Sequence, residues 1–204
     1  MKHHHRSTLS PSGRGASGQL RIIGGQWRGR KLRFWEVDGL RPTGDRIRET
    51  LFNWLAPIIA GSRCLDLFAG SGALGLEALS RGAASATLIE RHPQAISSLR
   101  ENCQLLGAEG AEILQADALS WLEKATPQHP YDIVFLDPPF SAELLQPSMD
   151  LLSRPGLLSA NALLYVESER HQPAPVPPQG MSLYKEKTAG QVCYRLYHSF
   201  ENGA

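Results

Sequence analysis

The sequence predicts an α/β fold with a mostly parallel, doubly wound sheet. Between residues 64 and 167, short apolar runs typical of buried strands alternate with stretches that have helical periodicity. A glycine-rich turn directly follows the first of these strands. Two further strand-like segments near the C-terminus are separated only by a short turn, which favours an antiparallel hairpin that closes the sheet.

The expected elements of the sheet follow one another regularly. The expected strands are 64–68, 86–90, 112–115, 132–136 and 163–167, and the expected helices are 73–81, 93–106, 119–124 and 143–152. Parallel strands need such crossover helices between them, so the helices should cover both faces. After a proline-rich connector at 173–178, strands at 182–187 and 192–199 should form the C-terminal hairpin.

The N-terminal part differs in composition from the rest of the chain. Residues 1–19 are rich in Ser, Gly and His and are expected to be disordered, with His3 to His5 as an inert tail or a tag remnant. Residues 20–32 resemble a short basic hairpin, and 46–55 has a helical apolar face. We therefore expect one domain over 20–204, in which an extension (20–62) precedes a catalytic core (63–204).

Charge is distributed unevenly along a chain of ordinary overall composition. Residues 1–48 hold 11 of the 21 Lys and Arg but three of the 20 Asp and Glu, which gives this part +8 and the remainder −7. Such asymmetry indicates a polyanionic partner. No apolar run approaches the roughly 18 residues of a membrane span. With three scattered cysteines and no secretory signal pattern, the expected location is the cytoplasm, without membrane attachment.

The glycine-rich turn at residues 70–75 matches the G-x-G-x-x-G pattern in its proper context, after a strand and before a helix. Gly70 and Gly72 permit a tight turn and a close approach of a ligand to the backbone. Asp66 lies four residues before Gly70, at the carboxyl end of the strand. A carboxylate there would repel a pyrophosphate, so a cationic amino-acid group is the better ligand.

Acidic residues also end the next two strands. Glu90 lies 20 residues after Gly70, where a carboxylate can accept hydrogen bonds from ribose hydroxyls; the alternative is an ordinary exposed glutamate. Asp117, followed by Ala118, could accept a hydrogen bond from an adenine amino group. It could equally cap the helix that follows.

The tetrapeptide Asp137-Pro138-Pro139-Phe140 closes the apolar strand 133–136. Two prolines remove two N–H donors and restrain the turn, so its carbonyl groups remain available as acceptors. The Asp137 carboxylate and the Pro138 carbonyl would then hold the exocyclic amine of a base, while Phe140 stacks on a base that has left its helix. The alternatives are an acidic residue ending a strand before a proline turn, and a core aromatic.

Together, Asp66, Glu90, Asp117 and Asp137 should surround one crevice at the carboxyl ends of the strands, and the ligand they describe is S-adenosylmethionine. The stretch 66–72 with 137–140 resembles the class I amino-methyltransferases, which act on exocyclic nitrogens of bases. Within that class, residues 21–197 resemble the RsmD family of small-subunit ribosomal RNA guanine-N2 methyltransferases. The matching segments are 21–25, 41–43, 46–53, 75–81, 165–167 and 190–197.

This resemblance implies a Rossmann-like class I fold and methylation of guanine N2 in 16S ribosomal RNA, with a small-subunit particle as the expected partner. Because the methyl group of the cofactor is already activated, we expect no metal, and we expect a monomer. It also implies that the loop before the first helix covers the methionine part of the cofactor, which makes Thr43 and Arg46 candidates. A helix cap and a surface cation are their respective alternatives. Guanine over adenine rests on the resemblance alone, so adenine-N6 transfer to DNA or RNA remains an alternative.

The basic hairpin is the candidate RNA-binding surface. Its cations suit phosphate contacts and its tryptophan suits one stacked base. If the hairpin were merely solvated, the tryptophan would instead belong to the core. A nicotinamide-dependent oxidoreductase would explain only the glycine turn and Glu90, and a hydrolase nucleophile elbow at 69–73 lacks its partner residues. The candidate RNA-binding residues are Arg21, Trp27, Arg28, Arg30, Lys31 and Arg33.

Overall fold

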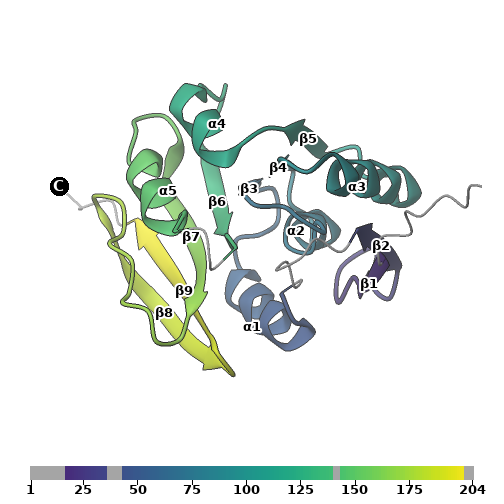
Figure 1. The fold of residues 1–204 in the computed structure, drawn as a ribbon, viewed down its shortest axis with the longest axis horizontal. Coiled ribbons are helices and arrows are strands. Elements are labelled where there is room, and N and C mark those ends of the chain that lie inside the picture. The colour runs from purple at the N-terminus through teal and green to yellow at the C-terminus, as the bar shows by residue number, and fades with distance from the viewer. Residues whose placement is uncertain (1–16, 36–42, 140–142, 200–204) are drawn as a thin grey trace, which may run out of the picture.

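In the computed structural model, the described residues are 17–35, 43–139 and 143–199, and they form helices packed on both faces of a seven-stranded sheet (Figure 1). The alternation of strands and helices expected from the sequence is confirmed. The strands of this sheet are β3 (Arg63–Asp66), β4 (Ser85–Glu90), β5 (Ala111–Gln115), β6 (Tyr131–Leu136), β7 (Leu158–Glu169), β8 (Met181–Ala189) and β9 (Val192–Ser199). The helices are α1 (Asp45–Leu55), α2 (Gly75–Ser80), α3 (Pro93–Leu106), α4 (Ala118–Lys124) and α5 (Leu145–Leu152).

The strand order is β5-β4-β3-β6-β7-β9-β8. Neighbours from β5 to β7 pair in parallel, whereas β9 runs antiparallel to both β7 and β8, so the C-terminal hairpin closes the sheet as expected. The chain builds outward in one direction from β3 to β5 and then resumes on the other side with β6. Ligands bind outside the carboxyl ends of the strands at such a switch point.

Two apolar clusters lie on opposite faces of the sheet. One joins α1, α2 and α3 to the side chains of alternate strand residues such as Phe135 and Tyr165. The other joins α4 and α5 to the intervening residues, such as Leu136 and Val166. Because neighbouring strand residues face opposite sides, this division fixes which helices each strand-end side chain meets. Among the described residues, no helix has the length and apolar character needed to cross a membrane.

The N-terminal hairpin, called the arm below, forms a separate two-stranded sheet of β1 (Ser17–Arg21) and β2 (Lys31–Trp35). It lies beside α3 in Figure 1. The prediction of disorder over 1–19 is wrong for residues 17–19. These residues belong to β1 and pair with β2 as far as Ser17 opposite Trp35. The rest of that stretch, with His3 to His5, lies outside the described residues.

Several element boundaries differ from the sequence predictions for local reasons. Helix α2 begins at Gly75, not at residue 73, because Gly72 has a φ of 79° and the turn continues past it. Helix α5 begins at Leu145, not at residue 143, because Glu143 has a left-handed φ of 48°. Strand β7 begins already at Leu158, which pairs with Tyr131 across an irregularity in the register.

Candidate functional site

The glycine turn wraps closely around the end of β3. Gly70 and Gly72 have φ values of 49° and 79°, a region that favours glycine. A Cβ on Gly72 would also come within 2.6 Å of Leu99 Cδ2. Directly after the turn, the Gly75 N–H donates to Asp66 Oδ2 at 2.9 Å. The two glycines are therefore required by the shape of the turn itself.

Asp66 is buried at the carboxyl end of β3. Burial, helped by the nearby carboxylates of Asp137 and Glu90, raises its pKa to about 7 against the lowering effect of the hydrogen bond from Gly75. A carboxyl group in this state gains from a neighbouring cation, because the cation favours its charged form. The attraction of Asp66 for a cationic group stays a prediction, and its carboxyl also holds the turn together through the bond from Gly75.

Glu90 is buried, in contrast to the exposed glutamate that the sequence left open. Its Oε2 accepts from the Gly70 N–H at 2.9 Å, and its Oε1 accepts from the Arg91 and His92 N–H groups at 2.8 and 2.7 Å. These bonds fix the carboxylate against the glycine turn. Substituting Glu90 should therefore disturb the turn as well as any ligand bound there.

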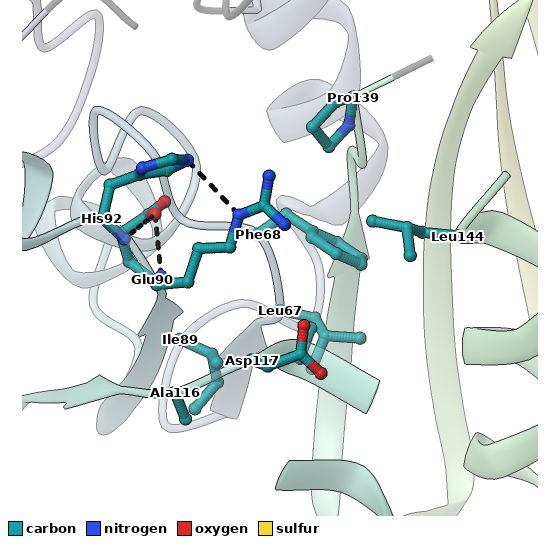
Figure 2. A pocket seen from close by; sticks show the side chains of 11 residues that line it. Leu67, Phe68, Ile89, Glu90, His92, Ala116, Asp117, Pro139 and Leu144 are labelled. Carbon is teal, nitrogen blue, oxygen red and sulfur yellow. Dashed lines mark hydrogen bonds between the residues drawn. The ribbon is translucent and has the colours of Figure 1, made fainter. Parts of the chain in front are cut away.

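A pocket lies between the ends of β3, β4 and β5, and Figure 2 shows Glu90 and Asp117 on its wall together with Pro139 and Leu144. Asp117 Oδ1 accepts from the Ser120 N–H at 3.0 Å, so Asp117 does cap α4, and it lines the pocket as well. Ala118 lines it beside Asp117. Apolar walls with two carboxylates suit a nucleoside, whose flat base prefers apolar contacts and whose hydroxyl and amino groups need acceptors. The remaining wall includes Leu67, Phe68 and Ile89.

Asp137 directly follows β6 and is half-buried. Its Oδ2 accepts a hydrogen bond from the Thr43 hydroxyl at 2.9 Å. Burial raises the pKa of Asp137 to about 6, against the lowering effect of that hydrogen bond, so the carboxylate form still prevails at neutral pH. Pro138 and Pro139 continue from it, and Pro139 lines the nucleoside pocket. Phe140 lies outside the described residues.

Thr43 has a position that neither sequence interpretation anticipates. It does not cap α1, because the N-cap residue is Gly44 and no side chain caps that helix. It is buried and donates to Asp137 instead. Arg46 is exposed, in agreement with the surface-cation alternative. A covering role for either residue over the cofactor stays a prediction.

Arg48, which sequence reasoning missed, holds Thr43 in place. Its side chain is only 1% exposed, and its Nε donates to the Thr43 carbonyl at 3.2 Å. Its Nη2 donates to the Arg21 carbonyl in the arm at 2.9 Å and to Asp45 Oδ1 at 2.6 Å. One guanidinium group therefore connects the arm with the loop that positions Asp137.

Glu77, also missed, is the fully buried partner of Arg48, with Oε2 and Nη1 3.4 Å apart. It accepts the N–H groups of Ile23 and Gly24 in the arm at 2.8 Å each, and Arg81 Nε at 2.8 Å. An arginine and a glutamate on amphipathic helices usually face solvent, so local pattern gave no signal for this pair.

The arm presents its cations to solvent. Trp27 is half-buried and packs against the core, and its backbone N–H donates to Ser80 Oγ at 3.0 Å, which favours the packing alternative over base stacking. Arg30 also donates to the Leu105 carbonyl at 3.0 Å. The exposed cations of the arm are Arg21, Arg28, Arg30, Lys31 and Arg33.

Within 17–35, 43–139 and 143–199, no cluster of three or more His, Cys, Asp or Glu side chains could hold a metal ion.

Comparisons with known proteins show the family and the fold of this chain. The family described as "Conserved hypothetical protein 95" matches residues 20–198. "Ribosomal RNA small subunit methyltransferase D" of Escherichia coli strain K12 is 55% identical over 188 residues, which cover 92% of this chain and 93% of that protein. The solved structure of yhhF from Escherichia coli, also 55% identical, superposes with a TM-score of 0.81 and covers 90% of this chain and 99% of its own.

A more distant solved structure shares the fold. SMU.776 complexed with SAH is 14% identical and covers 96% of this chain and 58% of its own, with a TM-score of 0.66, which is evidence for the fold alone. The sheet of this protein is thus that of the S-adenosylmethionine-dependent methyltransferases. On the strength of the family match and of 55% identity over nearly the whole chain, the protein belongs to the RsmD family of ribosomal RNA small subunit methyltransferases.

Proposed function

We propose that this protein transfers the methyl group of S-adenosylmethionine to the exocyclic N2 amine of a guanine in the 16S ribosomal RNA of the small subunit. The observation that carries the proposal is Asp137, a carboxylate fixed by a hydrogen bond from Thr43 and placed two residues before Pro139, which lines the nucleoside pocket. Family membership supports ribosomal RNA as the substrate.

The residues present fit S-adenosylmethionine. Glu90 would accept hydrogen bonds from the ribose hydroxyls, Asp117 would accept from the adenine amino group, and the apolar pocket wall would contact the adenine ring. Asp66 would attract the cationic amino group of the methionine part. That cation would in turn favour the ionised form of Asp66, whose pKa in the free protein is raised to about 7. When bound, the cofactor supplies a methyl group that is already activated on a sulfonium.

The target amine is a poor nucleophile, because its lone pair is delocalised into the purine ring. The Asp137 carboxylate and the Pro138 carbonyl would each accept one N–H of the amine, which turns the lone pair toward the methyl group. The same acceptors stabilise the positive charge that develops on nitrogen. Holding nitrogen at attack distance supplies much of the remaining rate.

Substrate binding would use the arm, whose five exposed cations lie on a surface that is docked to the catalytic part through Glu77 and Arg48. Phosphate contacts give affinity and orientation without reading sequence. The arm would therefore position the RNA, and the pocket beside Asp137 would receive the base.

The direct test is transfer of labelled methyl groups to small ribosomal subunits from cells that lack the protein, followed by mapping of the modified nucleotide. We expect N2-methylguanine at one position of 16S ribosomal RNA. Asp137→Ala should lower kcat about a hundredfold or more while cofactor affinity stays within a few-fold, as loss of a transition-state acceptor does.

Asp132→Ala is a suitable control, because Asp132 lies on the same strand β6 but pairs with Arg63 at 3.0 Å. Its kcat should stay near that of the wild type. A methylated adenine N6 would establish the alternative substrate instead. Near-normal turnover by Asp137→Ala would exclude the mechanism, and a parallel loss of cofactor binding would assign Asp137 to the cofactor site.

A further inference from the structure

A patch of cationic and aromatic side chains lies where β8, the edge strand of the sheet, passes α1. Trp54 of α1 stacks on Tyr194 of β9, with ring centroids 5.5 Å apart and an interplanar angle of 29°. From β8, Lys185 Nζ and Lys187 Nζ lie 5.9 and 6.0 Å from the centroid of the Trp54 ring. We call Trp54, Tyr184, Lys185 and Lys187 the edge patch.

An irregularity in β8 adds an exposed ring to the edge patch. Leu183 pairs with Tyr197 on β9. The next pair joins Lys185 to Leu196, so Tyr184 is an extra residue in the strand. Such bulges redirect side chains. Tyr184 is 54% exposed, and Lys185 Nζ lies 5.0 Å from its ring centroid. The edge patch therefore presents an open aromatic ring to solvent with a cation beside it.

The charges of β8 are divided between the two faces of the sheet. Successive residues of a strand point to opposite faces. Lys185 and Lys187 share the face on which α1 lies. Glu186, between them, points to the other face, where Arg195 Nε donates to its carboxylate at 2.6 Å. From the charged residues of β8, the α1 face thus receives two lysines and no carboxylate, so it suits a negatively charged partner.

The register of the sheet places the edge patch in line with Asp137. Asp137 directly follows β6, and the pairing of β6 with β7 places it beside Glu167. In the same row, Glu167 pairs with Tyr194 of β9, and Tyr194 pairs with Lys187 of β8. The bond from Thr43 shows that Asp137 also faces α1. Asp137 and Lys187 are therefore three strands apart on one face, roughly 14 Å at about 4.8 Å per strand.

We propose that the edge patch is a second RNA contact, which binds the substrate strand about four nucleotides from the target guanine, since a stacked strand advances about 3.4 Å per nucleotide. The two ammonium groups would contact phosphates, and the Tyr184 ring would stack on a base. This inference rests on the proposed function for the choice of RNA.

The edge patch complements the arm. In Figure 1, α1 lies between the arm and the hairpin of β8 and β9, and it contacts the two through Arg48 and Trp54 respectively. RNA would thus be held on either side of α1, with Asp137 on the same face. A protein strand could also pair with an exposed sheet edge, but it would use backbone groups of β8 and gain little from the two lysines.

The test is the double variant Lys185→Gln, Lys187→Gln, with binding to protein-free 16S ribosomal RNA and to small-subunit particles measured over a range of salt concentrations. Each phosphate contact contributes about 0.7 to 0.9 to the log-log slope, so the slope should flatten by about 1.5 units with both substrates. The KM for particles should rise severalfold, while kcat and the affinity for S-adenosylmethionine stay within a factor of about two.

Two further variants separate charge from stacking. Tyr184→Ala should weaken RNA binding about fivefold or more without changing the salt slope, because stacking releases no counterions. Lys124→Gln is the matched control, since Lys124 is an exposed cation of α4, which packs on the opposite face of the sheet. It should leave both the slope and the KM unchanged.

The possible results also separate this inference from the proposed function. An unchanged slope and KM in the double variant would overturn the edge patch as an RNA contact, even if the wild type methylates the RNA. A defect with particles that is absent with protein-free RNA would assign the patch to a ribosomal protein and likewise overturn the inference. If the wild type binds RNA but transfers no methyl group to it, the proposed function fails, and the salt slopes still decide on the edge patch.

Discussion

Cofactor binding should depend on pH through Asp66. The carboxyl group is buried, and burial together with the charges of Asp137 and Glu90 raises its pKa to about 7. In the free protein Asp66 is therefore largely protonated in mildly acidic buffer. A cationic amino group beside it favours the ionised form, so binding below neutral pH must release a proton.

The magnitude follows from the pKa of Asp66. Each pH unit below about 7 should cost up to about 1.4 kcal/mol, or a factor of ten in affinity, if Asp66 must be ionised in the complex. Between about pH 7.5 and about pH 5.5 the affinity for S-adenosylmethionine should then fall roughly twentyfold to thirtyfold. The contribution of Asp66 to the free energy of unfolding has the opposite sign to that of an ordinary carboxylate. Ionising the buried group is unfavourable, so this destabilisation is absent below the unfolded pKa of 3.8 and reaches its full size above about pH 7.

Isothermal titration calorimetry across this range, in two buffers of different ionisation enthalpy, measures both the affinity and the released proton. Asp66→Asn should bind weakly at every pH and release no proton from this site. It should also raise the free energy of unfolding of the cofactor-free protein above neutral pH. Asp132→Asn, a partly exposed carboxylate, is the control. Affinity that stays constant between about pH 5.5 and about pH 7, without proton release, would refute the reasoning.

Three further outcomes are expected. Glu90→Ala should raise the KM for the cofactor more than it lowers kcat, because ribose is bound alike in ground and transition states; unchanged affinity by calorimetry would remove Glu90 from the cofactor site. Neutralising Arg28, Arg30 and Lys31 together should flatten the log-log salt dependence of RNA binding by about two units and leave cofactor affinity intact, whereas an unchanged slope would place RNA docking elsewhere. Glu77→Ala should lower the free energy of unfolding in urea by about 3–5 kcal/mol, because it removes the buried carboxylate beside Arg48 and leaves the Ile23 and Gly24 N–H groups without their acceptor; a loss like that of an exposed helix glutamate would show that these contacts contribute little.

The position of the acidic residues at the strand ends was largely predictable, because strand ends are encoded locally. Asp66, Glu90 and Asp137 each end or follow an apolar run, and parallel strands bring such ends to one edge. The bond from Thr43 to Asp137 was not predictable, because it joins residues 94 positions apart. Arg48 and Glu77 escaped notice for a related reason: each has the local pattern of an ordinary solvated helix residue, and only tertiary packing buries them.

Composition predicted the exposed cations of the arm but not the environment of its tryptophan. Clustered cations indicated an exposed surface, and the five cationic side chains are exposed. The same clustering suggested base stacking for Trp27, yet its ring packs against the core because the turn before it lies directly on α2. Composition could not distinguish the two, since both place an aromatic among basic residues.

The arm is attached to α2 through its backbone, whereas its cationic side chains face solvent. Glu77 receives main-chain N–H groups of Ile23 and Gly24, and a Cβ on Gly25 would come within 1.8 Å of the Ser80 carbonyl oxygen. The attachment therefore demands particular backbone geometry but few particular side chains. If the arm binds RNA as proposed, substitutions at its outward-facing positions can suit it to different RNA surfaces, because the contacts that join it to α2 use its backbone.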